Sequence, residues 1–345
     1  VRLFKRGVSM GFLTLPQKLS EQLPINFAVY LDHVLSSFCT SQEVTTICKL
    51  IGLLDNKDVM LLHYRKCLSK RVIYDDQISL DTNNFFLTTL TGLIGNTLTH
   101  PILQVLNELQ TSRVFTEKIK NLVPLQTKVN IFSLQQLFQR PLSLTLPSEI
   151  EDIWKIIITQ YARIHEKRKL VLCETSSTVF LKSGKMTIEM PLPHYMIFKE
   201  GETVMNDVAK KYNIDSESLD NFCGDLESAK LITRKENSIY PVSEFKGDVI
   251  IVQMTQKKKN LPSDVIDEKA EVEEKRFQTI VGVQVRLMKR HKKITHQDLI
   301  RLTNDQVKKT FVPDSRLLRK ALEYLIDNEY IERDKSDKDL LIYLS

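Results

Sequence analysis

The chain has 345 residues, enough for two or three domains of ordinary size, and its 42% hydrophobic and 27% charged residues are typical of a folded protein. No apolar run approaches the roughly 20 residues of a membrane span, and no signal-peptide pattern opens the sequence, which excludes those two classes. Because the first residue is Val1, we expect a fragment of a longer protein. The five cysteines form no C-x-x-C pair, which indicates reduced core residues in an intracellular protein.

The formal charge of +6 is unevenly distributed along the chain. The stretch 275–301 holds eight Lys and Arg residues against a single Asp, a net charge of +7, so the remaining residues together carry a net charge of −1. The basic character is therefore local to one segment and its flanks.

The first 125 residues show helical spacing with few strand signals. Apolar residues recur at the spacing of an amphipathic helix in 27–38, 57–73, 81–95 and 100–119. Asp81 is a plausible N-cap, and Gly95 is a favoured residue just past a helix end. The pattern predicts a helical bundle over 1–125.

The residue pattern of 126–196 is typical of a small α/β domain. Short runs rich in β-branched residues predict strands at 128–134, 169–173, 178–181 and 185–190, with Ser183-Gly184 as a hairpin turn between the last two. A long helix is expected after Pro147, where acidic residues open the first turn and basic residues follow the last.

An internal repeat fills the C-terminal part. Leu219, Leu226 and Arg234 have counterparts at Leu318, Leu325 and Arg333, at a constant offset of 99 residues. Each copy reads as helix, helix and hairpin, which is the layout of a winged helix. We therefore predict winged-helix domains at 197–250 and 271–345, separated by a charged linker at 251–270 that should let the second copy move. The predicted fold class is α+β and mostly helical.

Catalytic signatures are scarce. No serine lies in a nucleophile motif, the histidines show no metal-ligand spacing, and the glycines form no phosphate-binding loop. We expect no catalytic residue, no metal and no cofactor, and thus a binding or scaffold protein. A nucleic-acid-binding protein that uses the basic segment 275–301 is the alternative, although its charges lie outside the helix that would read bases.

The basic segment has one lysine in a distinctive place. On a helical count, Phe277, Ile280, Val281 and Met288 form one apolar stripe, from which Arg286, Arg290 and Lys293 point away. Lys289 falls at the rim of this stripe, so its base is anchored while its ammonium is free. Such a lysine suits the acceptor of a transferred acyl group, and the cations around it suit recognition by an acidic enzyme.

Three stretches give the chain a family resemblance. The stretch "VRLMKRHKKITHQDLI", with the later "LEYLIDNEYIERD" and "IYLS", resembles the C-terminal end of cullins. The stretches "LLDNKDVMLLHYRKCLSKRVI" and "LPSEIEDIWKIIITQYARIHEKRKLVL" resemble earlier cullin segments, in the same order. The chain therefore resembles the C-terminal half of a cullin, with departures at Gly282, Gln284, Leu172 and the "EMPLPHYMIF" stretch.

The resemblance implies a non-catalytic scaffold of a ubiquitin ligase in the cytoplasm and nucleus. A RING-box protein would add a strand to the α/β sheet, near Val171, Val179 and Ile188, and would recruit the ubiquitin-charged E2. A Rub/Nedd-type modifier, delivered by its own E2, would be attached to Lys289, with Arg286, Met288 and Arg290 recognised around it. Substrate adaptors would bind a preceding N-terminal half.

Overall fold

The computed structural model describes residues 17–37, 39–74, 78–123, 127–133, 141–242, 249–252, 254, 264–337 and 339–344. They fall into two compact units, of which the first combines Val1–Glu108 with Asn260–Ser345 and the second is Leu109–Lys259. Among the helices described, none is both long and apolar enough to cross a membrane. The mostly helical α+β class is confirmed.

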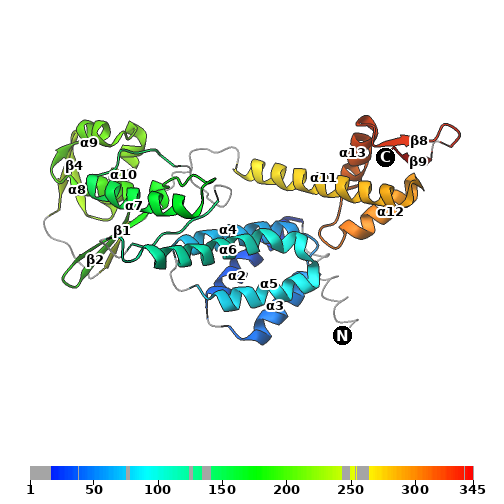
Figure 1. Ribbon diagram of the computed structural model, residues 1–345, viewed down its shortest axis with the longest axis horizontal. Coiled ribbons are helices and arrows are strands. Elements are labelled where there is room, and N and C mark those ends of the chain that lie inside the picture. Colours follow the sequence, from blue (N-terminus) through cyan, green and yellow to red (C-terminus); the bar gives the residue numbers. More distant parts are fainter. Residues whose placement is uncertain are drawn as a thin grey trace. The chain divides into compact units, whose positions relative to one another are not determined.

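The N-terminal helices form a bundle (Figure 1, blue to cyan). Helix α2 packs along α4, and α3 packs along α5. The four helices expected from apolar spacing are confirmed, and α3 is an additional helix that the sequence analysis did not predict. The bounds are α2 Gln17–Ser36, α3 Ser41–Leu53, α4 Lys57–Tyr74, α5 Leu80–Ile94 and α6 Asn96–Ile119.

Helix starts in the bundle are fixed by side-chain caps. Thr40 and Glu43 form a capping box at α3, in which each side chain accepts the backbone N–H of the other, at 3.3 and 2.8 Å. For α5 the N-cap is Ser79, whose hydroxyl accepts the Thr82 N–H, so the prediction of Asp81 as the cap is wrong by two residues. Asp81 lies in the first turn, where its charge matches the helix dipole. Gly95 ends α5 with φ of 90°, as expected.

The buried face of α4 is wider than the apolar spacing in 57–73 indicates. Of the residues at that spacing, Leu68 and Val72 are buried and Val59 and Leu62 are half-buried, and Met60, Leu61 and Tyr64 are buried as well. The ring of Tyr64 packs edge-on against Phe86 of α5, and its hydroxyl lies 3.2 Å from Asn83 Oδ1. A buried tyrosine hydroxyl needs a polar partner, and Asn83 supplies one.

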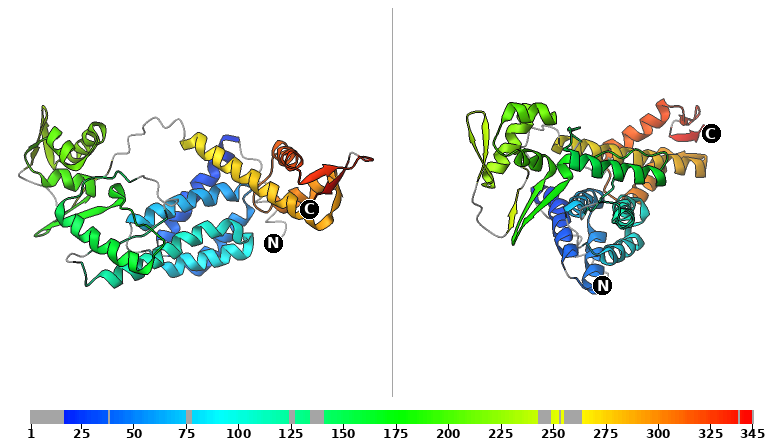
Figure 2. Two further views of the ribbon diagram at one scale, coloured as in Figure 1. Left: turned by 45° about the horizontal axis from the view of Figure 1, so that its top comes forward. Right: turned by 60° about the vertical axis from the view of Figure 1, so that its left-hand side comes forward.

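The α/β sheet has the order β1–β2–β6, with strands β1 (Thr178–Ser183), β2 (Met186–Pro191) and β6 (Val249–Ile251). The predicted hairpin is confirmed, with Gly184 in the turn at φ of 61°. Strand β6 pairs in parallel with β2 and was not expected, since about 60 residues separate them along the chain. Figures 1 and 2 show the β1–β2 hairpin in green.

Two predicted strands are not formed. Residues 128–133 and 169–173 have no ladder partner in the part of the chain that the structure describes, and Leu134 lies outside it. Their aliphatic side chains are nevertheless in contact with the core: Val129, Ile131 and Leu170 pack against one cluster with α7 (Ser148–Ile164). A strand also needs a second backbone at hydrogen-bonding distance, and sequence spacing does not supply one.

The first winged helix contains α8 (Leu192–Lys199), β3 (Thr203–Val204), α9 (Met205–Tyr212), α10 (Ser216–Ser228), β4 (Ile232–Lys235) and β5 (Ser238–Pro241). Its core is continuous with the α/β sheet, because Ile188 and Met190 of β2 are buried in one cluster with Leu226 and Ile239. The boundary predicted at 196/197 therefore cuts through α8, and the α/β domain and the first winged helix share one core.

The second winged helix repeats this order with α11 (Asp264–His291), β7 (Lys293–Thr295), α12 (His296–Val307), α13 (Ser315–Asp327), β8 (Ile331–Arg333) and β9 (Leu340–Tyr343). Both small sheets place the last strand in the middle, as β3–β5–β4 and β7–β9–β8. The predicted repeat is thus matched in topology. The linker expected at 251–270 is too long at its C-terminal end, because α11 already begins at Asp264; residues 253 and 255–263 lie outside the described part.

Candidate modification site

The basic segment of the sequence forms the end of α11 (Figure 1, yellow). The helix stops at His291 because Lys292 adopts a left-handed conformation with φ of 62°. The Lys292 N–H still reaches the Met288 carbonyl at 2.8 Å, and its own carbonyl accepts the Tyr343 N–H at 2.9 Å. The helix end is therefore held against β9.

One face of α11 builds the core of the winged helix. Phe277, Ile280 and Met288 of the predicted stripe are buried, whereas Val281 is only half-buried. Val283 and Leu287, which the sequence analysis left out of the stripe, are buried as well. The face is wider than predicted because α12 and α13 both pack on it.

Three cations of the last turns point to solvent without a partner. Arg286, Lys289 and Arg290 are exposed, and within the described part of the chain none of them makes an ion pair or a side-chain hydrogen bond. The Lys289 ammonium is therefore accessible, and its helix is held rigid by the buried residues beside it. Sequence reasoning placed these three residues together, and the structure does bring them together.

The neighbouring lysines are engaged. Lys292 lies with its ammonium 5.1 Å from the centre of the Tyr343 ring, a cation–π contact. The Lys293 ammonium is 3.9 Å from an Asp334 carboxylate oxygen. Of the three lysines Lys289, Lys292 and Lys293, Lys289 alone has neither a cation–π contact nor an ion pair among the residues described.

Met288 has another role than the one expected for it. Its side chain is completely buried in the core with Leu287 and Ile280, so a modifying enzyme cannot touch it. The residue belongs to the sequence motif because it anchors the helix next to Lys289. Of the three residues expected to be recognised around Lys289, only Arg286 and Arg290 are exposed.

Gln284, a departure from the family pattern, ties α11 to α13. Its side chain is fully buried, and its amide nitrogen donates to the Leu318 carbonyl at 3.2 Å. Among the residues that the structure describes, the amide oxygen has no hydrogen-bond partner. The polar residue is thus half satisfied in an apolar core, and it fixes the register of the two helices.

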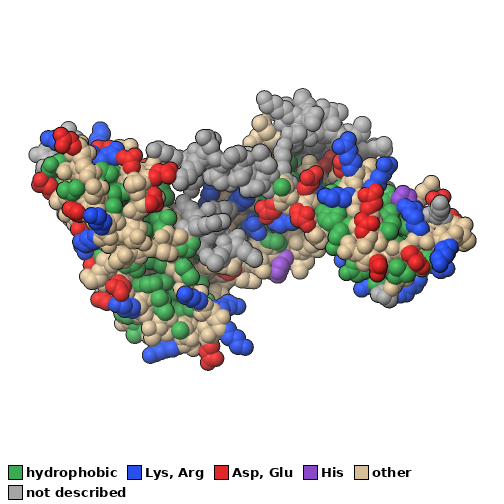
Figure 3. All heavy atoms as spheres, turned by 90° about the horizontal axis from the view of Figure 1, so that it is seen from above, with side chains coloured by type: hydrophobic (Ala, Val, Ile, Leu, Met, Phe, Trp, Pro, Cys, Tyr) green, Lys and Arg blue, Asp and Glu red, His purple; other side chains and the backbone are tan. Residues whose placement is uncertain are grey.

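The alternative reading as a nucleic-acid-binding protein finds little support in the surface of this domain. Arg316, Arg319 and Lys320 occupy the start of α13, but Glu323 and Asp327 follow on the same helix, and all five are exposed. The face seen in Figure 3 carries Lys and Arg side chains interspersed with Asp and Glu.

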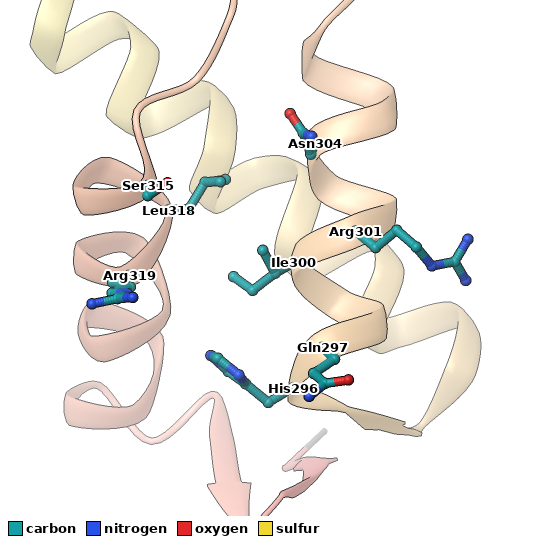
Figure 4. A pocket seen from close by; sticks show the side chains of 8 residues that line it. All are labelled: His296, Gln297, Ile300, Arg301, Asn304, Ser315, Leu318 and Arg319. Carbon is teal, nitrogen blue, oxygen red and sulfur yellow. The ribbon is translucent and has the colours of Figure 1, made fainter.

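A shallow groove of about 440 Å³ between α12 and α13 is lined by polar and apolar side chains, and Figure 4 shows the guanidinium of Arg301 directed away from it. Arg301 is paired with Asp298 at 3.0 Å. The cationic side chains of α12 and α13 form no continuous row, which contacts with the phosphate backbone of a nucleic acid would require.

The three residues expected near a RING-box strand are spread over different positions. Val179 on β1 and Ile188 on β2 lie on the same face of the hairpin, where Ile188 is buried and Val179 is half-buried. Val171 is 49% exposed and lies before the hairpin, in the unpaired stretch 169–173.

A buried pair escaped the sequence analysis. His194 of α8 is fully buried, and its Nε2 lies 3.1 Å from Asp225 Oδ2 of α10, while its Nδ1 has no partner within the described part of the chain. Burial lowers the pKa of His194, and the hydrogen bond and charge of Asp225 oppose this. Nothing in the spacing of these residues predicts the contact. Among the residues described, no group of His, Cys, Asp and Glu could hold a metal ion.

Comparison with known proteins places this site in a family. Residues 275–337 match the family model of the cullin protein neddylation domain. Cullin-6 of Caenorhabditis elegans is 25% identical over 352 residues, which cover 92% of this chain and 48% of that protein. Cullin-1 of Oryza sativa subsp. japonica is 23% identical, with 90% and 45% covered. Cullin-1 of Dictyostelium discoideum is also 23% identical, with 99% and 49% covered.

The match to the neddylation model covers most of α11, all of α12 and α13, and Lys289 itself, which defines the C-terminal winged helix as a modification domain. Over about nine-tenths of its length the chain is similar to cullins at 23–25% identity, as a divergent counterpart of their C-terminal half. The chain spans about half the length of the curated relatives it matches.

Proposed function

We propose that this chain is the C-terminal scaffold of a cullin-RING ubiquitin ligase, activated by attachment of a Rub/Nedd-type modifier to Lys289. The family supports a scaffold rather than an enzyme, and the neddylation domain supports the modification. The observation that carries the site is the accessible ammonium of Lys289 at the end of a helix anchored in the core. In this proposal the protein acts in the cytoplasm and nucleus, and substrate adaptors bind a preceding N-terminal half.

The α/β sheet is where we place the RING-box protein, which would bring the ubiquitin-charged E2. Because β2 lies between β1 and β6, strand β1 is an edge of the described sheet. The stretches 128–133 and 169–173 are apolar and have no strand partner among the residues described. A strand from a partner would gain main-chain hydrogen bonds from such edges.

Replacing Val171 by Pro is expected to weaken binding of a RING-box protein by roughly five- to a hundredfold, because Pro removes an N–H that an added strand would use, a loss of about 1–3 kcal/mol. The matched control is Val171→Ala, which keeps the N–H. Val171 is 49% exposed and makes no hydrogen bond in the described part of the chain, so the free protein should unfold at an unchanged temperature. Titration calorimetry measures the affinity, and equal affinity for both variants would move the partner strand elsewhere.

The experiment that tests the proposed function is co-purification of the 345-residue chain with a RING-box protein expressed beside it. A stable stoichiometric complex is the expected result. A nucleic-acid-binding protein would instead bind duplex DNA, with an affinity that falls steeply as salt rises. Failure to bind a RING-box protein, together with such salt-dependent DNA binding, would replace the scaffold assignment by the alternative.

A further inference from the structure

The stretch 127–133 forms backbone hydrogen bonds with two side-chain hydroxyl groups of α6 instead of with a neighbouring strand. Ser112 and Thr116 are four residues apart and therefore share one face of the helix. Thr116 Oγ1 accepts the Val129 N–H and donates to the Val129 carbonyl, both at 3.0 Å. Ser112 Oγ accepts the Ile131 N–H at 2.7 Å and donates to the Ile131 carbonyl at 3.2 Å.

This pairing has a consequence for the other edge of the stretch. In an extended chain, the N–H and C=O of a residue point to one edge, and those of the next residue point to the opposite edge. Val129 and Ile131 therefore direct their backbone groups to α6, and Asn130 and Phe132 direct theirs away from it. Within the described residues, the backbone groups of Asn130 and Phe132 make no hydrogen bond, and Asn130 Oδ1 is buried without a partner.

The stretch is also anchored by its side chains. Val129 and Ile131 pack against the core that holds Phe115 and Ile119 of α6 and Tyr161 of α7, and Leu170 packs against the same core. The following stretch, 141–146, differs in that Glu174 accepts the N–H groups of Leu142 and Leu144 at 2.9 and 3.0 Å, while the Thr145 N–H reaches the Tyr212 carbonyl at 3.0 Å. The N–H groups of 141–146 are thus bonded on more than one side, whereas the backbone groups of Asn130 and Phe132 make no hydrogen bond among the residues described.

We propose that Ser112 and Thr116 are positioning residues that hold 127–133 extended, so that the edge formed by Asn130 and Phe132 is ready to pair with an extended strand of a partner protein. The inference rests on the proposed function in one respect, since the partner is the RING-box protein. The hydroxyls satisfy the buried edge before binding, so the partner does not have to pay the ordering entropy of this stretch.

The test uses the whole chain with Ser112→Ala and Thr116→Val combined, which removes both hydroxyls with little change in volume. Affinity for the RING-box protein should fall about tenfold or more. The combination Ser112→Thr with Thr116→Ser keeps both hydroxyls and should bind like the wild type. Thr159→Val, which removes an exposed hydroxyl of α7 bonded to its own helix, should also bind like the wild type.

Amide hydrogen exchange supplies a readout that general destabilisation would not mimic. In the free chain, the amides of Val129 and Ile131 should exchange slowly and those of Asn130 and Phe132 fast, and the double variant should lose only the slow pair. With the partner bound, Asn130 and Phe132 should become slow. Wild-type affinity of the double variant, or fast exchange at Asn130 and Phe132 in the complex, would overturn the inference.

The two failures are distinguishable. A wild-type chain that binds no RING-box protein would overturn the proposed function and the partner assigned to this edge. The hydroxyl pairing is judged separately, since slow exchange at Val129 and Ile131 that depends on Ser112 and Thr116 is required of the free chain. Equal exchange rates at all four amides of the free chain would overturn it.

Discussion

Lys289→Arg is expected to abolish attachment of the Rub/Nedd-type modifier. The substitution keeps the positive charge and the helix, because the side chain points to solvent. It removes the nucleophilic amine, since a guanidinium stays protonated and cannot attack a thioester carbonyl. In the proposed reaction of the wild type, the Lys289 nitrogen would form an amide bond with the modifier's C-terminal carbonyl, the thiol of the E2 would leave, and the nitrogen would lose a proton to solvent.

The measurement is a gel shift after incubation of the chain, bound to its RING-box partner, with the modifier and its E1 and E2. Most of the wild-type chain should gain the mass of one modifier, and Lys289→Arg should gain none. Lys292→Arg and Lys293→Arg are the matched controls and should shift like the wild type, since Tyr343 and Asp334 engage those side chains. A shift that persists in Lys289→Arg and disappears in Lys292→Arg or Lys293→Arg would reassign the acceptor.

Asp225→Ala should lower the free energy of unfolding of the second unit by about 2–3 kcal/mol, because it leaves the buried His194 with no hydrogen-bond partner on either ring nitrogen. Asp225→Asn should cost less, since its amide oxygen can still accept from Nε2. Asp220→Ala, which removes a side chain that is 59% exposed from the same helix, should cost less than about 1 kcal/mol. Trp154, the single tryptophan, lies in α7 of this unit and reports its unfolding in urea by fluorescence.

The His194–Asp225 pair also predicts how the stability of the second unit changes with pH. Burial keeps the pKa of His194 below its ordinary value of 6.5, so the unfolded chain takes up a proton that the folded chain does not. This contribution to stability is complete above pH 6.5 and is lost as the pH falls below it, by up to about 1.4 kcal/mol per pH unit. His194→Gln should remove this part of the slope between about pH 7.5 and 5.5. An identical slope in the variant would contradict the assignment.

Several elements could be predicted from contiguous residues. The Ser183–Gly184 hairpin, the end of α5 at Gly95 and the helix after Pro147 depend on turn and cap chemistry, which acts over a few positions. The two winged helices were visible as a repeat at an offset of 99 because equivalent core positions keep their spacing. The Thr40–Glu43 capping box marks the start of α3 by the same kind of local chemistry, but α3 was not predicted from it.

Contacts between segments that are distant along the chain could not be predicted from the sequence. The polar partner of the buried Tyr64 comes from Asn83 of another helix, and the membership of Val283 and Leu287 in the core depends on two helices packing on α11. The missing strands at 128–133 and 169–173 show the same limit, because β propensity describes a side chain and pairing requires a second backbone.

The sequence by itself determined the resemblance to cullins, the order of most elements and the basic helix with Lys289 in it, since each of these is carried by local spacing and by motifs that need no neighbour. Only the tertiary structure decided which lysine is free, through the contacts of Lys292 with Tyr343 and of Lys293 with Asp334. It also decided that the hydroxyls of Ser112 and Thr116 meet Val129 and Ile131. The physical reason is that a hydrogen bond or ion pair depends on distance in space, and folding sets that distance for residues far apart in the chain.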